Sequence, residues 1–464
     1  MEGTQPMKRL LTLFMLAALM LSLIACGEKS SAGLSEHDTG NDLTQSNSDP
    51  TPVTEPELTS FEKLFRYGPL PAADENGLWG FIDSTGAYVI SPAYLEAERF
   101  GKDGLALVQD QNGLYGYLDP SGQFAIAPQF ESAHSFSNGL AVASGDGGYG
   151  YIDTSGSFVI APQFFEAYNF AEGLAVVRVG DYISGLYGYI DSSGDYAIEP
   201  RYLDAFSFYD GVAAVTPADG TRDQYYLIDA SGVRVTDFTF SVSSRTYSGD
   251  GGREYIWFSE GWYPARLENS MRCYINPEGK LLQSSSGTVY VANGSSFFEG
   301  LAPALSSETG FWGCINLQGE WVIAPEYGDI GSFSNGLAIA SSTIIDGGDY
   351  CYRIIDAQGN VISDFPFPDY FYDENGTLKS ELYGIEPVSL SVRELLPVAE
   401  YQGSYSRKFG YMDQNWNVVI DCIYDQAGSF SLDMSYAKVQ LNGLWGMIDR
   451  DGNWLIPANF KELG

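Results

Sequence analysis

The chain has 464 residues, of which 44% are hydrophobic and 14% aromatic, so it can bury a sizeable core. Its 60 acidic residues outnumber its 24 basic residues and give a net charge of −36. A charge of this size repels nucleic acid and anionic surfaces, which argues against a DNA- or RNA-binding role. The 53 glycines and the many aromatic residues favour strands and turns over helices.

The N-terminal segment is typical of a secretory signal. Lys8 and Arg9 precede an uncharged apolar run over residues 10–24, which is short for a spanning helix of about 20 residues. The run leads into the sequence LIAC (23–26), which looks like the lipobox of bacterial lipoproteins. That resemblance implies cleavage before Cys26 and attachment of a lipid to its thiol. The alternative is an ordinary signal peptide with an incidental cysteine.

The next segment, to about residue 60, is rich in Ser, Thr, Asp, Glu and Pro and has hardly any aliphatic residues. Such a composition cannot bury enough apolar surface to offset the entropy lost on ordering. We therefore predict three parts: a lipoprotein signal peptide over 1–25, a lipid-anchored flexible tether over 26–60, and a β-rich repeat domain over 61–464.

A repeated motif dominates the third part. It recurs ten times between residues 77 and 460, mostly at intervals of 34 to 40 residues, and its clearest copies include GLWGFIDSTGAYVISP (77–92) and GLWGMIDRDGNWLIP (443–457). A repeat of this period indicates a tandem array in which each unit buries its apolar face against its neighbours.

An acid or amide followed three positions later by glycine marks the centre of nearly every copy. Asp83 with Gly86 and Asp449 with Gly452 are two examples. This spacing between two strand-like runs predicts a hairpin turn, in which the side chain caps the turn and the glycine supplies the left-handed residue. A row of calcium ligands or general acids is the alternative, but Asn replaces Asp in two copies and the glycine already explains the pattern.

Each turn lies between two predicted strands. The first has an aromatic residue followed by glycine, as in Trp79-Gly80, Trp312-Gly313 and Trp445-Gly446, and we expect the glycine to leave room for a neighbouring ring or backbone. The second usually ends at a proline such as Pro92. A Phe-x-x-Gly-Leu-Ala segment, as at 136–141, adds a further strand. The unit is therefore a three-stranded meander.

The fold class predicted is all-β, with about ten such meanders in tandem. An open, solenoid-like superhelical array is favoured because propellers have four-stranded blades and close at four to eight; the alternative is one or two propeller-like rings. Wider spacing between some copies predicts insertions near 233–256 and 361–393.

These spaced residues resemble the WG-repeat family, bacterial proteins with tandem Gly-x-Trp-Gly-Tyr-Ile-Asp-x-x-Gly units that are frequently exported lipoproteins. The resemblance covers nearly everything from about residue 61 to 464. It implies an interaction role without naming a partner.

Cofactor and metal chemistry have little support. The body has four cysteines at 273, 314, 351 and 422, no Cys-x-x-Cys pair, and one histidine, His134, besides His37 in the tether. We expect neither a metal site nor a cofactor nor catalytic residues. The cysteines are expected to be buried free thiols, with a disulfide as the alternative.

Tryptophans outside the recurrent Trp-Gly position are the candidate binding residues: Trp262, Trp321, Trp416 and Trp454. Exposed, they would stack against sugar rings or hydrophobic peptide; the alternative is a core role. The predicted function is that of a monomeric, non-enzymatic scaffold, anchored through Cys26 at a bacterial cell membrane or surface and contacting an envelope protein, peptidoglycan or polysaccharide. The alternative is an extracellular carbohydrate-active enzyme on a propeller-like body.

Overall fold

The computed structural model describes residues 58–221, 223–242, 255–268, 270–342, 352–364, 385–387, 394–401 and 407–464. The chain divides into two units, Met1–Thr59 and Ser60–Gly464. The predicted signal peptide, most of the tether, Cys26, Cys351 and much of both predicted insertions lie outside the described residues. Within the described part, no helix has both the length and the apolarity needed to cross a membrane.

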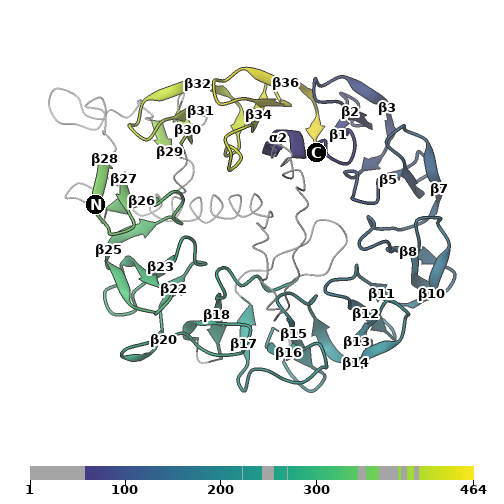
Figure 1. Ribbon diagram of the computed structural model, residues 1–464, viewed down its shortest axis with the longest axis horizontal. Helices are drawn as coiled ribbons and strands as arrows, with labels where there is room; N and C mark the ends of the chain where they lie inside the picture. The colour runs from purple at the N-terminus through teal and green to yellow at the C-terminus, as the bar shows by residue number, and fades with distance from the viewer. Residues whose placement is uncertain are drawn as a thin grey trace, which may run out of the picture. The chain divides into compact units, whose positions relative to one another are not determined.

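One short helix, α2 (Ser60–Lys63), precedes a long succession of strands (Figure 1). The first half of the strands is β1 (Leu70–Ala73), β2 (Trp79–Ile82), β3 (Tyr88–Tyr94), β4 (Glu96–Ala97), β5 (Ala106–Gln109), β6 (Tyr115–Leu118), β7 (Phe124–Phe130), β8 (Ala141–Gly145), β9 (Gly148–Ile152), β10 (Phe158–Phe164), β11 (Glu166–Ala167), β12 (Ala175–Val179), β13 (Leu186–Ile190), β14 (Tyr196–Ala205), β15 (Val212–Pro217), β16 (Tyr226–Asp229), β17 (Phe240–Val242), β18 (Tyr263–Leu267) and β19 (Arg272–Ile275). The remainder is β20 (Gln283–Ser284), β21 (Gly287–Thr288), β22 (Asn293–Gly294), β23 (Leu301–Leu305), β24 (Trp312–Asn316), β25 (Trp321–Ile330), β26 (Leu337–Ser342), β27 (Tyr352–Asp356), β28 (Val361–Asp364), β29 (Ile385–Pro387), β30 (Leu396–Tyr401), β31 (Arg407–Met412), β32 (Val418–Tyr424), β33 (Gln426–Ala427), β34 (Ala437–Leu441), β35 (Leu444–Ile448), β36 (Trp454–Phe460) and β37 (Glu462–Leu463).

The predicted three-stranded meander is present, and it carries a fourth strand that the sequence did not suggest. In the second blade the order is β4-β5-β6-β7, all antiparallel. The extra strand, β4, begins two residues after β3 of the preceding repeat, because the chain stays extended beyond the proline. In β14 and β25 the two segments are continuous, so one strand pairs with neighbours in two successive blades.

The ten repeats form ten blades in the described residues. The six-stranded and seven-stranded sheets each hold two blades joined through β14 and β25, and each sheet by itself stays open. The last strand, β37, pairs with the first, β1, where the Lys461 and Gly464 N–H groups donate to Ala73 O at 3.0 Å and Pro71 O at 2.8 Å. The all-β prediction is confirmed, and of the two arrangements predicted the strand pairing supports the propeller-like ring.

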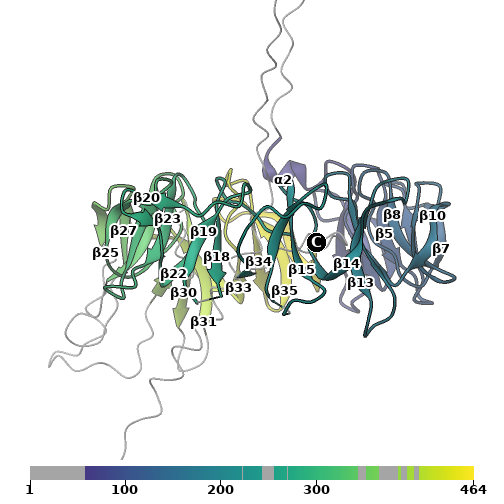
Figure 2. The same ribbon diagram turned by 90° about the horizontal axis from the view of Figure 1, so that it is seen from below.

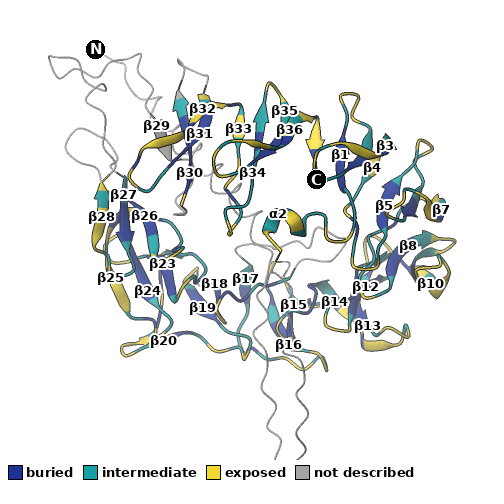
Figure 3. Ribbon diagram, turned by 45° about the horizontal axis from the view of Figure 1, so that its top comes forward, coloured by how far each residue is buried: buried dark blue, intermediate teal, exposed yellow. Residues whose placement is uncertain are grey.

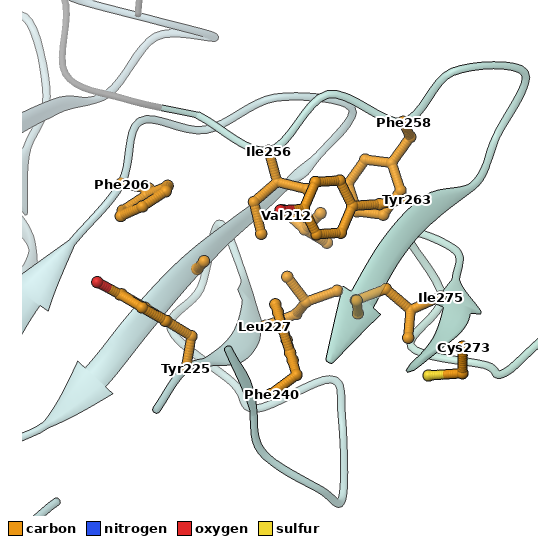
Figure 4. Packing of buried hydrophobic residues seen from close by; sticks show 12 residues of the cluster. Phe206, Val212, Tyr225, Leu227, Phe240, Ile256, Phe258, Tyr263, Cys273 and Ile275 are labelled. Carbon is orange, nitrogen blue, oxygen red and sulfur yellow. The ribbon is translucent and has the colours of Figure 1, made fainter. Parts of the chain in front are cut away.

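The hydrophobic core lies between blades. Ten separate clusters of buried residues occur among the described residues, and each joins side chains of two successive repeats. Figure 4 shows one of them, where Leu227 and Phe240 meet Tyr263 and Ile275. An open row of ten units has nine such junctions. The tenth joins Met447 and Ile456 of the last repeat to Leu70 and Ile82 of the first.

Part of each predicted insertion belongs to a blade. Residues 240–242 form β17, which pairs with β18, and Phe240 is fully buried. Residues 361–364 form β28, which pairs with β27. These segments are strands of degenerate repeats and not loops, because the hydrophobic positions persist where the strand glycine and the terminal proline are missing.

The repeat glycines are required for two different reasons: a positive φ in the turn, and a close approach of the neighbouring backbone in the strand. In the turn, Asp83 Oδ1 accepts the N–H groups of Thr85 at 2.9 Å and Ala87 at 3.1 Å, while Gly86 adopts a φ of 84°. In the strand, a Cβ on Gly80 would lie 2.5 Å from Ile90 O and 2.7 Å from the nitrogen of Pro92. The bulged third strand therefore presses on the Trp-Gly strand, and only glycine fits there.

A buried tyrosine fixes each of several blades to the next. Tyr117, Tyr151 and Tyr189 occupy the position two before the recurrent Asp and are fully buried. Their hydroxyls donate to the carbonyls of His134 at 2.7 Å, Tyr168 at 2.8 Å and Phe206 at 2.8 Å, each 17 residues further on. Such bonds satisfy a buried polar pair and lock the connector against the strand.

The described cysteines are free thiols. Cys273 and Cys314 are buried and Cys422 is half-buried. Cys273 occupies the repeat glycine position and Cys314 the buried tyrosine position, and they lie in two different core clusters. Burial raises the pKa of both thiols to about 12, so they act as small apolar side chains.

Candidate interaction surface

The outermost strand of most blades presents its first two side chains to solvent. The shared burial pattern of β3, β7, β10 and β32 begins with two exposed residues and then buries the third. These strands lie on the outer side of the blades in Figure 1, and their exposed colouring is visible in Figure 3. We call the exposed large apolar residues at these two positions the rim belt: Tyr88, Val89, Phe124, Phe158, Val159, Tyr196, Trp321, Val322, Val361, Ile362, Val418, Val419 and Trp454.

The belt is periodic because it follows the repeat. Its first position lies five residues after the recurrent Asp or Asn and its second lies six after. Eight of the ten blades contribute, and the exposed fractions range from 36% for Tyr88 to 57% for Ile362. Scattered exposed apolar residues are ordinary, whereas a series recurring at one structural position indicates a contact surface. Seen edge-on, the strands run across the thickness of the ring (Figure 2).

The aromatic rings of the belt are held in place by the preceding blade. Phe124 packs edge-on against Tyr94 at 6.2 Å between ring centroids, and Phe158 against Phe130 at 6.1 Å. The same contact closes the ring, where Tyr88 meets Phe460 at 5.7 Å. One edge of each ring is thus fixed while the rest faces solvent, which lowers the entropy lost when a partner binds.

The belt offers side chains more readily than main-chain pairing. Each of the outer strands β3, β7, β10, β14 and β25 contains a proline, at 92, 128, 162, 200 and 325. Proline has no N–H to donate, and its presence in an edge strand discourages pairing with another chain. A partner strand added to the sheet edge is therefore disfavoured.

The four candidate binding tryptophans fall into different environments. Trp321 and Trp454 belong to the belt, with 42% and 39% of their surface exposed. Trp416 is buried and its indole N–H donates to Ser363 Oγ at 2.8 Å, so it cannot serve as a stacking platform. Trp262 is half-buried against the cluster containing Tyr274 and Phe297.

Trp321 and Trp454 lie outside the Trp-Gly position, as predicted, but they are in register with the repeat. Both lie five positions after Asn316 and Asp449, where other copies carry Tyr88 or Phe124. Counting from the turn instead of from the Trp-Gly pair would have revealed the whole belt. The Trp-Gly tryptophans themselves, Trp79, Trp312 and Trp445, are half-buried in their blades.

The turn aspartates are acceptors. Hydrogen bonds, the largest from the Thr85 hydroxyl, lower the pKa of Asp83, and the Ser121 hydroxyl does the same for Asp119. A carboxyl so stabilised in its charged form is a poor general acid. Asp329 differs, since burial raises its pKa from 3.8 to about 6. Among the described residues, no group of three His, Cys, Asp or Glu side chains is arranged to hold a metal ion.

Two shallow clefts lie on the ring. The larger, of ≈ 450 Å³, is lined by Arg201, Tyr202, Asp219 and Tyr226. The smaller, of ≈ 280 Å³, is lined by Asn138, Leu140, Phe170 and Glu172 among others. Asp329 lines neither of them.

Ten blades in a ring and a periodic apolar rim define a propeller-like repeat protein of the binding or scaffold class. The family profile described as "WG containing repeat" matches residues 79–115, 115–147, 149–182, 187–216, 312–341, 409–445 and 445–464. The chain belongs to the WG-repeat family.

The other comparisons are less specific. None of the curated protein sequences compared with the chain matches it. The chain is similar to the crystal structure of BamB from Moraxella catarrhalis, with a TM-score of 0.32 and 13% identity over 63% of this chain and 90% of that one. A crystal structure of the eukaryotic initiation factor gives a TM-score of 0.38 and 10% identity, covering 85% and 96% of the two chains. The ring rests on the strand pairing described above.

Proposed function

We propose that the protein is a non-enzymatic scaffold, held at a bacterial membrane by a lipid on Cys26, that binds a protein partner through the rim belt. The observation that carries the proposal is the recurrence of exposed large apolar residues, singly or in pairs, on the outer strands of eight blades. The anchor rests on the lipobox-like sequence, and the flexible composition of residues 27–60 would let the ring reach a partner away from the lipid surface.

The chemistry of the belt favours a protein over a glycan. Next to the rings stand purely aliphatic side chains, with Val89, Val159 and Ile362 between 51% and 57% exposed. Sugars need hydrogen-bonding groups beside an aromatic platform, whereas aliphatic and aromatic residues together are typical of protein contact patches. The net charge of −36 repels acidic polysaccharides and steers basic partners toward the ring.

Repetition supplies strength to such a surface. The exposed residues of one blade offer little contact area. Once a partner has bound one blade, however, the neighbouring blades are present at a high effective concentration, so each further contact forms more readily. Because the belt residues are fixed by neighbouring rings, the sites keep a constant spacing around the rim. An elongated or oligomeric partner gains most from this arrangement.

The experiment compares three forms of the chain in cross-linking to a solubilised envelope fraction. The test variant carries Val89→Lys, Val159→Lys and Val419→Lys, all on the belt, and the control carries Ile183→Lys and Leu432→Lys, which are 89% and 72% exposed but lie off it. We expect a defined protein adduct with wild type and control that is lost with the test variant. The proposal is contradicted if the test variant still forms the adduct. It is also contradicted if adding a protein-free glycan fraction as a competitor prevents the adduct from forming.

The anchor has its own test. The Cys26→Ser variant should move from the membrane fraction to the soluble fraction and lose its lipid mass, without change in the partner bound by the ring. A membrane fraction unchanged by this substitution would contradict the lipid anchor and leave the rim proposal standing.

The absence of enzymatic activity is also part of the proposal. Asp329 is the group whose raised pKa would suit a general acid, yet it lines neither cleft. We expect no release of reducing sugar when the protein is incubated with a panel of neutral and acidic polysaccharides. Hydrolysis that is lost in Asp329→Asn would support the carbohydrate-active alternative instead.

A further inference from the structure

Some cations of this acidic chain pair with carboxylates and others do not; two of the latter, Arg201 and Arg234, lie at or beside one cleft. Arg178 pairs with Glu166, Lys408 with Asp425 and Arg450 with Glu394. Among the described residues, neither Arg201 nor Arg234 has a carboxylate within ion-pair distance. Both are exposed, so their guanidinium groups are accessible to an external anion.

Both arginines are held in position by neutral groups. Arg201 donates from Nε to the Tyr202 hydroxyl at 3.1 Å and from Nη2 to Gly232 O at 3.0 Å, and its guanidinium lies 5.2 Å from the Tyr202 ring centroid. Arg234 donates from Nε to Thr236 O at 2.6 Å and from Nη2 to Phe238 O at 3.1 Å. Each guanidinium has five N–H groups, so each keeps three for a ligand.

Arg201 lines one cleft, and Arg234 contacts a ring of that lining without lining the cleft itself. Arg201, Tyr202, Asp219 and Tyr226 line the ≈ 450 Å³ cleft, and the guanidinium of Arg234 lies 4.4 Å from the centroid of the Tyr226 ring. The volume lies in the range of about 300–1,000 Å³ that is usual for small-ligand sites. Burial raises the pKa of Tyr226, which keeps its hydroxyl protonated near neutral pH.

We propose that this cleft, between the fourth and fifth blades, binds a small sugar acid, with its carboxylate on Arg201 and with Arg234, stacked on the Tyr226 ring, adding positive charge beside it. The planar guanidinium fork matches a carboxylate in a two-bond geometry. The rest of the lining supplies the Asp219 carboxylate as an acceptor for sugar hydroxyls, and the Tyr226 ring supplies an aromatic surface. None of these residues belongs to the rim belt, so the site stands or falls independently of the scaffold proposal.

The test is isothermal titration of the full chain with D-galacturonate, D-galactose and inorganic phosphate. We expect one saturable site for galacturonate, with galactose at least tenfold weaker because it lacks the carboxylate. Phosphate should bind more weakly than galacturonate, since it makes no contact with the sugar-facing lining. Equal binding of galactose, tighter binding of phosphate, or no saturation with galacturonate up to about 10 mM would overturn the proposal.

Variants separate the arginine fork from charge alone. Arg201→Gln should weaken galacturonate binding at least tenfold, and Arg201→Lys should fall between Arg201→Gln and wild type. Arg234→Gln should weaken it less, because Arg234 acts through its charge and does not line the cleft. The control is Arg266→Gln, an exposed arginine on β18 that should bind as wild type does. Unchanged affinity in both glutamine variants overturns the site. The comparison of galacturonate with galactose on the wild-type chain remains decisive if a variant does not fold.

Discussion

The junction between the last and first blades can be tested by a single substitution, Leu463→Ala. Leu463 lies on β37, is 5% exposed, and belongs to the cluster that contains Leu70, Ile82 and Phe460. In a closed ring this side chain fills the interface between two blades. In an open array it would lie in the exposed terminal unit, and truncating it would change little.

The structure sets the size of the effect. A fully buried leucine truncated to alanine costs about 2–5 kcal/mol, the sum of lost burial and of the cavity left behind. The neighbouring main-chain bonds from Lys461 to Ala73 and from Gly464 to Pro71 depend on the same strand. We expect the free energy of unfolding to fall by about 3 kcal/mol, near the middle of that range because the adjacent rings close part of the cavity.

The assay is equilibrium unfolding in urea, with hydrogen exchange of the Lys461 and Gly464 amides as a local readout. The matched control is Leu432→Ala in the same repeat, where the side chain is 72% exposed and the change should stay within about 0.5 kcal/mol. Equal stability of the two variants, with the Lys461 and Gly464 amides exchanging freely in the wild type, would refute the closed ring.

Three further predictions concern single residues. Gly150→Ala should cost about 1–3 kcal/mol in thermal unfolding, because its Cβ would lie 2.7 Å from the nitrogen of Pro162, while Gly101→Ala, with 3.9 Å to its nearest neighbour, should be nearly neutral. Tyr151→Phe should cost about 1–3 kcal/mol by leaving the buried Tyr168 carbonyl without its 2.8 Å bond, and Tyr182→Phe, 79% exposed, should cost little. Asp329 has a folded pKa of about 6 against 3.8 unfolded, so its contribution to stability is present below pH 4 and is lost as the pH rises through 6; Asp329→Asn should flatten that slope and gain roughly 2–3 kcal/mol at pH 7 in urea unfolding. A wild-type slope of the opposite sign would contradict this assignment.

The blade could be predicted from sequence because its determinants are local. The Asp83 turn, the Gly80 close approach and the alternation of exposed and buried residues all lie within one repeat. The fourth strand escaped notice because β4 has only two residues, Glu96 and Ala97, and no alternation can be seen in two positions. Its pairing with Gln109 and Val108 is visible only once the next repeat is in place.

The candidate sites were harder to predict, for two different reasons. The rim belt is local and lies in the sequence at a fixed offset from each turn. Its positions hold different residue types, such as Trp321, Tyr88 and Phe124, so a search for tryptophan alone finds only part of it. The cleft depends on contacts between Arg201 and the Gly232 carbonyl, 31 residues apart, and on main-chain acceptors that carry no sequence signature. The types of residue in the sequence do not indicate that Arg201 contacts the Gly232 carbonyl.

The usual number of blades in a propeller did not predict the closure of ten blades into one ring. Propellers usually close at four to eight blades, and the number is set by the wedge angle between neighbouring sheets. That angle depends on how small inner residues such as Ala141 and Ala143 balance larger outer ones such as Ile126 and Phe130 in the same interface. Repeat counting cannot supply it, because the number of repeats says nothing about the side-chain volumes in each interface. The decisive feature is that β37 stands in the last repeat where β4 and β11 stand in others, and it completes a blade by pairing with β1 of the first repeat.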